Sequence, residues 1–313
     1  IMSSNGVAWD KGSSNWYPKI VREIDMSREK TNFLKKNKDY SIPIIEGRMI
    51  QQHRFGAKIY VSGSGRRSSW LPNKFGFSVV KPQYWIETEL LSTKAKNRFR
   101  VERAGFCDIA GQTNERSMMA AIIPPGVVCG NKVPTILFPN DLNEERLFLW
   151  IGIVNSFPFD WLLRRVLTTT VNYFLLKSVH LPNIEPNSAR GRKIIKLTHQ
   201  IRTNDTSSKS IDLWNIAKIR AEIDIQVLAA YQLCHNDMEV ILSDFPLLDR
   251  GQPSISGEKK STITRDYLLT RTCEYFNIDS DKWSNRVVEA KKSGAIPYIY
   301  SENADIESLE KLS

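Results

Sequence analysis

The chain changes its hydrophobic period near residue 140, and this change limits the folds open to it. Between residues 40 and 139 the apolar runs are short and are interrupted by Gly and Pro, as in strands joined by turns. Beyond residue 140 apolar residues recur every three or four positions, most clearly at Ile216, Ile219 and Ile223, which predicts amphipathic helices. We therefore expect an α+β protein in which a β-rich domain is followed by a mainly helical module.

The individual elements follow from the same patterns. Strands are predicted over 58–61, 84–86, 99–109 and 119–123, and helices over 142–156, 159–166, 190–203, 211–234, 263–276 and 283–292. Residues 172–177 fit a strand or a helix equally well. The Gly- and Ser-rich start of the chain resembles a linker from an upstream domain.

Positive charge is concentrated in one segment of the chain. The formal net charge is +10, and residues 46–103 hold twelve Lys and Arg against four Glu. A basic segment in an otherwise balanced chain indicates a surface that faces a polyanion, with nucleic acid as the leading partner. Because no apolar run is long enough to span a membrane and no signal peptide is visible, we expect a cytoplasmic protein without a membrane partner.

Metal and thiol chemistry find little support in the sequence. The four cysteines are scattered, and neither they nor the four histidines have the spacing of zinc ligands. We expect reduced cysteines and no metal site in this chain.

Residues 98–125 carry most of the functional information. A run with arginines between apolar residues leads to a polar corner, QTNER, and then to a second apolar run that ends at Pro124-Pro125. Two strands joined at such a corner would place guanidinium and amide groups along one edge of a sheet. Those groups bind phosphates and base edges.

This segment also resembles the target recognition domain, of the TaqI-like specificity type, of adenine-specific DNA methyltransferases and type IIG restriction-modification enzymes. Cys107 stands where that family usually has an Arg. Further segments resemble the family in the same order: IIEGRMIQQHRF (44–55), LWIGIVNS through RR (149–165), Leu181-Pro182, RAEID (220–224) and EVILSDFP (239–246).

The resemblance implies that the chain recognises double-stranded DNA for an adenine-N6 methyltransferase of a bacterial restriction-modification or phage-defence system. The cofactor of the whole enzyme would be S-adenosylmethionine, bound by an upstream methyltransferase domain, with none in this chain. The expected domains are an entry linker (1–40), the recognition domain (41–186), a helical module (187–250) and a linker with C-terminal helices (251–313). The catalytic Asn/Asp-Pro-Pro-Tyr/Phe tetrapeptide does not occur in the sequence, so no catalytic residue is predicted.

Two groups of DNA contacts are expected. The candidates for base readout are Arg98, Arg100, Arg103, Gln112, Asn114 and Arg116. The candidates for phosphate contact are Arg48, Arg54, Lys58, Arg66, Arg67, Lys74, Lys94 and Lys96. For each candidate for base readout, the alternative is that its side chain faces solvent or pairs with another group of the protein.

Three other functions remain open on the sequence. The chain could be a stand-alone specificity subunit of a restriction-modification complex. It could be a metal-dependent nuclease that uses Asp249, Glu258 and Lys260. It could also be an interaction module that does not bind nucleic acid.

Overall fold

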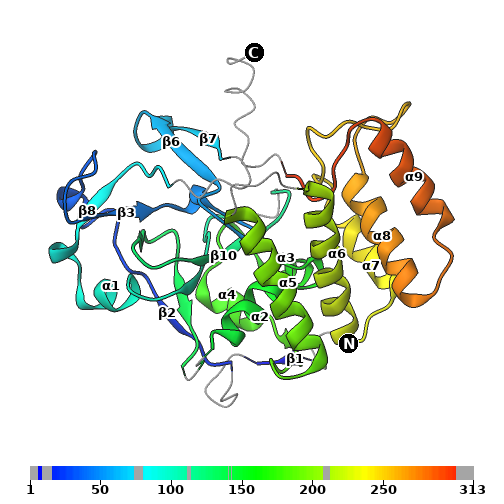
Figure 1. Cartoon of the computed structure of the whole chain (residues 1–313), viewed down its shortest axis with the longest axis horizontal. Helices are drawn as coiled ribbons and strands as arrows, with labels where there is room; N and C mark the ends of the chain where they lie inside the picture. The colour runs from blue at the N-terminus through cyan, green and yellow to red at the C-terminus, as the bar shows by residue number, and fades with distance from the viewer. Residues whose placement is uncertain are drawn as a thin grey trace.

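The computed structural model describes residues 6–8, 16–73, 80–110, 114–139, 141, 143–206 and 212–300. The α+β class predicted from the sequence is confirmed. A β-rich part, formed mostly by residues before 140, lies on one side, and helices α6–α9 lie on the other, with α2, α3 and α5 in the middle (Figure 1). None of the helices in the described ranges is long and apolar enough to cross a membrane.

Within the described residues, the β-rich part contains two small sheets and two hairpins. The first sheet is antiparallel in the order β10-β9-β12-β2, with β2 (Lys19–Val21), β9 (Arg103–Phe106), β10 (Ala120–Ile123) and β12 (Thr135–Leu137). The second has the order β11-β3-β8, with β3 (Ser41–Ile45), β8 (Trp85–Glu87) and β11 (Val128–Cys129), which runs parallel to β3. The hairpins pair β4 (Ile50–Gln51) with β5 (Arg54–Phe55) and β6 (Lys58–Ser62) with β7 (Ser69–Pro72). A separate pair joins β1 (Gly6–Val7) to β13 (Leu181–Pro182).

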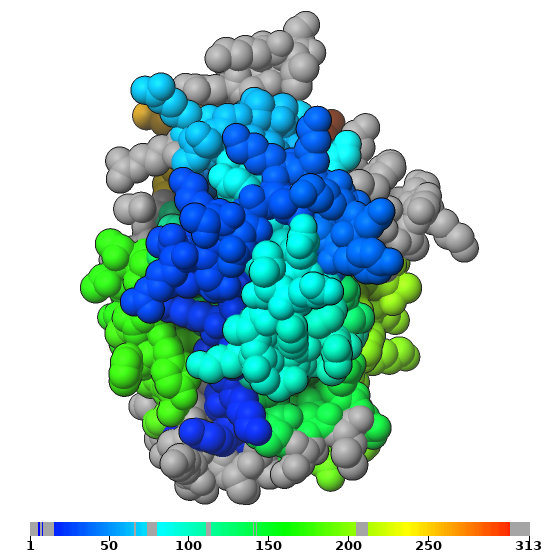
Figure 2. Space-filling model, turned by 90° about the vertical axis from the view of Figure 1, so that its left-hand side faces the viewer, coloured from blue at the N-terminus to red at the C-terminus, as the bar shows by residue number. Residues whose placement is uncertain are grey.

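Short 3-10 turns connect these strands and supply much of the surface between them. They are η1 (Lys30–Asn32), η2 (Gly47–Met49), η3 (Gly65–Arg67) and η4 (Thr88–Leu90). On the outer face of the β-rich part, the segment before residue 50 and the segment around α1 lie side by side, with the β6–β7 hairpin above them (Figure 2). This face is therefore assembled from segments that are far apart in the sequence.

The helices are α1 (Thr93–Arg98), α2 (Glu145–Val154), α3 (Phe157–Val166), α4 (Tyr173–Ser178), α5 (Ala189–Thr206), α6 (Leu213–Ala230), α7 (His235–Ser243), α8 (Ile263–Phe276) and α9 (Asp281–Lys292). Helix α2 is central, since every residue from Leu147 to Val154 is buried. At Gly152 a Cβ atom would lie 2.4 Å from Cγ2 of Ile194. The missing side chain therefore allows α5 to pack closely on α2.

Several local predictions differ from the structure. The strand expected over 99–109 is shortened to β9, because Phe99 instead forms the C-terminal cap of the preceding helix, α1. Residues 172–177 lie in a helix, α4, whose N-terminus is capped by Asn172. Residues 16–40, expected to be part of a linker, instead contribute β2 to the first sheet.

Asp249 is a buried carboxylate that links the end of the helical module to α8. Asp249 has a left-handed backbone conformation (φ 62°). Its carboxylate oxygens accept hydrogen bonds from the Thr264 N–H at 2.9 Å and from the Thr264 hydroxyl at 2.5 Å. Burial raises the pKa of Asp249 to about 7 despite these bonds, and the carboxylates of Glu115 and Asp266 add to the rise. Folding therefore favours the protonated form of this side chain.

We predict that the stability of the protein falls as the pH rises from about 4 to about 7, in part through Asp249. The pKa of Asp249 is raised in the folded state, so its stabilising effect is complete below the unfolded pKa and is lost as the pH passes through the folded value. Asp249→Asn keeps an acceptor for Thr264 but does not titrate. Urea unfolding at pH 4 to 8 should show a smaller loss of stability for Asp249→Asn than for the wild type, and equal slopes would contradict the assignment.

Candidate nucleic-acid interface

Arg103, a predicted base reader, lies in the interior of the β-rich part and is fully buried. Its guanidinium forms two hydrogen bonds with the Glu23 carboxylate, at 2.6 and 2.9 Å. Glu23 in turn accepts hydrogen bonds from the Cys129 N–H and the Thr135 hydroxyl, both at 2.8 Å. This placement gives Arg103 a structural role, because its donors are used to join strands of both sheets.

Arg116, a second predicted reader, is also buried and joins the β-rich part to the helices. Its Nε donates to the Asp160 carboxylate of α3 at 2.7 Å, and its Nη2 donates to the Asn155 carbonyl at 2.7 Å. The guanidinium carbon lies 3.9 Å from the centre of the Phe157 ring. Asp160 also accepts hydrogen bonds from the backbone N–H groups of Ser117 and Met118. Arg116 is thus placed where α3 meets the corner before β10.

The remaining predicted readers have different positions. Arg98 is buried, and its Nη2 donates to the Lys19 carbonyl at 2.7 Å. Arg100 is exposed and lies over the Phe99 ring. Asn114 is half-buried and lines a surface pocket. Gln112 lies outside the described residues.

The predicted phosphate contacts are also divided. Arg48, Arg67 and Lys94 are exposed, and Lys96 is half-buried with its ammonium donating to the Glu89 carbonyl at 3.1 Å. Arg54 and Lys58 are buried, at 7% exposure each. Lys74 and the side chain of Arg66 lie outside the described part of the chain.

Two adjoining surface pockets bring several of these residues together. One, of about 380 Å³, is lined by residues that include Asn114 and Lys132, and the other, of about 560 Å³, by residues that include Lys30. Both are lined by Met26, Glu46 and Arg48, so they form one continuous depression, which we call the Arg48 groove. It contains carboxylate, guanidinium and amide groups, the side-chain types that distinguish base edges.

A third pocket extends this surface. It has a volume of about 550 Å³, and its charged lining residues are Arg22, Arg28 and Lys94 together with Glu23, Asp25 and Glu29. Two of its lining residues, Asp25 and Asn131, are sequence neighbours of Met26 and Lys132, which line the Arg48 groove. The exposed basic residues along this part of the surface are Arg22, Arg28, Lys30, Arg48, Lys94 and Lys132. Arg22 and Lys132 pair with Asp108, and Arg28 pairs with Asp25, each at 3.7 Å. Phosphates would therefore compete with these weak surface pairs at three of the six cations.

Sequence reasoning missed Arg22, Arg28, Lys30 and Lys132. The first three lie in a segment that was interpreted as a linker, although residues 19–39 hold seven Lys and Arg against four Asp and Glu. That excess was a usable signal. Lys132 is an isolated residue in a turn, and only the fold places it beside Arg48.

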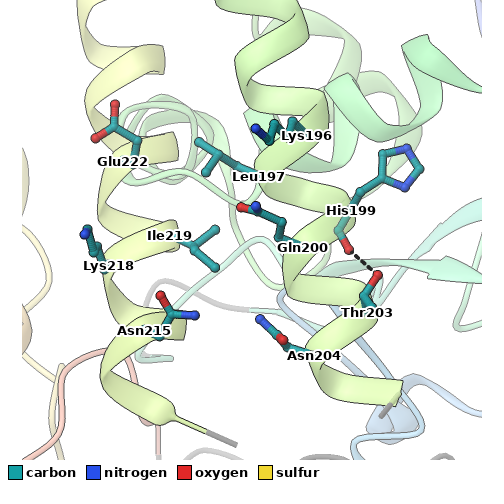
Figure 3. A pocket seen from close by; sticks show the side chains of 10 residues that line it. All are labelled: Lys196, Leu197, His199, Gln200, Thr203, Asn204, Asn215, Lys218, Ile219 and Glu222. Atoms are coloured by element: carbon teal, nitrogen blue, oxygen red, sulfur yellow. Dashed lines mark hydrogen bonds between the residues drawn. The ribbon is translucent and has the colours of Figure 1, made fainter.

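A separate groove of about 690 Å³ lies between α5 and α6. Leu197, Gln200 and Ile219 project into the space between these helices, whereas His199 points to the other side of α5 (Figure 3), where its ring stacks on Phe148. None of the residues predicted to contact DNA lines this groove. It is therefore a distinct feature of the helical module.

The three residues of the nuclease alternative are each bound to other groups. Asp249 accepts hydrogen bonds from Thr264, Glu258 forms an ion pair with Arg286 at 2.7 Å, and the Lys260 ammonium donates to the Pro246 carbonyl at 2.8 Å. Within the described ranges, no group of three or more His, Cys, Asp or Glu residues is arranged to hold a metal ion.

Comparisons with known proteins leave the family open: no protein-family model matches the chain, and no curated protein matches it significantly.

We predict that Arg103→Met and Arg116→Met each lower the free energy of unfolding by about 3–5 kcal/mol, because each leaves a buried carboxylate without its partner. Arg100→Met is the matched control and should change stability by about 0.5 kcal/mol or less, since Arg100 is exposed. Urea unfolding of the three variants measures this. Wild-type stability in Arg103→Met or Arg116→Met would refute the structural role of that arginine.

Proposed function

We propose that the chain recognises a sequence in double-stranded DNA as the specificity part of an S-adenosylmethionine-dependent adenine-N6 DNA methyltransferase. The system would be a cytoplasmic, bacterial restriction-modification or phage-defence system. The observation that carries the proposal is the Arg48 groove, where Glu46, Arg48 and Asn114 line one depression on a basic surface. Base-reading groups surrounded by phosphate-neutralising groups are what a DNA-recognition surface requires.

The segments that resemble the methyltransferase family support this assignment by their contacts. Arg116, from the polar corner, is paired with Asp160, from the resembling helix pair. Arg220, from the RAEID segment, donates to the Gln52 side-chain carbonyl of the entry segment at 3.0 Å. Segments matched separately in sequence therefore meet through specific polar contacts, as expected if the order of the motifs reflects a common fold.

Methyl transfer is assigned to a separate catalytic domain. The one Pro-Pro pair of the sequence, Pro124-Pro125, follows Ile123 rather than Asn or Asp. The Pro124 carbonyl accepts a hydrogen bond from Arg103 at 3.2 Å, so this pair supports the sheet. These residues do not fit a site for the target base and S-adenosylmethionine.

The two kinds of DNA contact should be separable by their salt dependence. The surface cations Lys30 and Lys132 carry no base-reading geometry and would contribute affinity that falls with salt. Arg48 can form paired hydrogen bonds with guanine, which contribute to sequence preference. A bound duplex would therefore lie along the Arg48 groove and extend toward Lys94.

We predict that the wild-type chain, incubated with random-sequence duplex pools over a salt series, retains one short sequence motif at raised salt. Arg48→Ala should lower affinity for that motif by about 5- to 150-fold, the equivalent of about 1–3 kcal/mol. Arg192→Ala is the matched control, because Arg192 is exposed on α5, away from the groove. Its affinity should equal that of the wild type.

Two results would contradict the proposal. Retention that falls steeply with salt and enriches no motif would leave a basic surface without sequence readout. The absence of retention at low salt would exclude DNA recognition by this chain.

A further inference from the structure

Glu46 occupies the junction of the two halves of the Arg48 groove. Its side chain lines both pockets, and its residue immediately precedes η2, which carries Arg48. Its Oε1 atom is buried and has no hydrogen-bond partner among the described residues. A buried acceptor without a donor is unusual in a folded protein and costs stability, so Glu46 would gain a hydrogen bond if its side chain turned to meet a ligand donor in the pockets that it lines.

The surroundings of Glu46 contain one cation close by and several polar groups. Burial raises the pKa of Glu46 to about 7, and Arg48 opposes the rise only in part. The ionisable groups that line the same groove from other elements are Lys30, Tyr84, Cys107 and Lys132. Burial, and then the charge of Glu46, raises the pKa of Tyr84, so the phenol stays protonated near neutral pH. The groove therefore contains a carboxyl group that can accept a donor but is not neutralised by a salt bridge among the described residues.

Arg48 is held in position beside this carboxyl group. Its Nη1 donates to the Ser68 carbonyl at 3.3 Å and to the Ser68 hydroxyl at 3.1 Å. Ser68 is itself fixed, because its hydroxyl donates to the Gly65 carbonyl at 2.8 Å and accepts from the indole N–H of the buried Trp70 at 3.0 Å. One side of the guanidinium is thus anchored, and the described residues provide no partner for Nε and Nη2. Such preorganisation lowers the entropy lost on binding.

We propose that Glu46 and Arg48 together read one C·G base pair in the major groove. Glu46 accepts a hydrogen bond from the cytosine N4 amine, and Arg48 donates to O6 and N7 of guanine. Adenine also presents an amine, at N6, but its N7 acceptor lies beside that amine and would repel a carboxylate. Cytosine has no acceptor at the corresponding position, so a carboxylate selects it. This inference rests on the proposed function and names the base pair that the groove selects.

A carboxylate that must be ionised to accept the cytosine amine makes binding dependent on pH. Glu46 of the free protein has a pKa of about 7, and an amine donor in the complex stabilises the ionised form, which lowers that value. Affinity for the C·G-containing site should therefore fall as the pH decreases from 8 to 6, by about tenfold if the bound value lies well below 6. If binding depended instead on a protonated histidine near a phosphate, affinity would rise as the pH decreases.

The test compares the wild type with Glu46→Gln in selection from random duplex pools at pH 8, followed by affinity measurements at pH 6 and 8. We expect the wild-type motif to contain one C·G pair for which Glu46→Gln has a weaker preference. The amide can also pair with N6 and N7 of adenine, whereas Arg48 still favours guanine on the opposite strand, so the variant should accept A·T at that position and distinguish C·G from it less strongly. The expected change in preference is about 5- to 150-fold, and the tenfold pH effect should disappear.

Two controls keep the result interpretable. Thermal unfolding at pH 8 should show Glu46→Gln at least as stable as the wild type, since it removes a buried charge. Glu46→Asp should retain the preference for C·G and the pH effect at lower affinity. An unchanged motif and pH profile in a folded Glu46→Gln would overturn the inference while leaving the proposed function intact. A wild type that enriches no motif would instead refute the proposed function.

Discussion

The interaction on which the rest of the structure depends is the buried ion pair between Arg116 and Asp160. It joins the corner before β10 to helix α3, and Asp160 also accepts hydrogen bonds from the backbone of Ser117 and Met118. Arg220 and Asp224 of α6 extend this contact between the two parts. Arg220 donates a hydrogen bond to Gln52. Asp224 accepts hydrogen bonds from the Phe157 N–H and the Tyr298 hydroxyl, both at 2.7 Å. Since a buried guanidinium without its carboxylate is costly, this network fixes how the helices sit against the β-rich part.

The arginines of this chain have two different roles, one in the interior and one at the surface. Arg103 and Arg116 are buried and paired, and they hold sheets and helices together. Arg48 is exposed at the surface, and among the described residues its guanidinium is held by Ser68 through Nη1 alone, which leaves its other nitrogens for a ligand. The rigid interior in turn sets the positions of η2 and of the turns that form the Arg48 groove. The proposed recognition surface, which is built from short turns, would gain precision from such a support.

The sequence predicted the helices well, because their apolar period is strong over many residues, and α8 has the predicted bounds. The strands were harder, because runs as short as β9 carry little periodicity. The roles of the arginines could not be told apart from the sequence, since Arg100 and Arg103 stand in similar contexts. What distinguishes them is a partner 80 positions away, Glu23, which only the fold brings near. The groove was likewise hidden, because Glu46 and Lys132 meet only in three dimensions, and Glu46 was not among the predicted contacts.

The central claim is that DNA lies in the Arg48 groove. Hydrogen–deuterium exchange of the wild-type chain, with and without bound duplex, tests it most directly. The account predicts slower exchange with duplex in the segments around 26–33, 46–50, 64–68 and 130–132, which border the groove, and unchanged exchange in α5 and α6. Protection confined to the groove between α5 and α6, with none around Arg48, would contradict it.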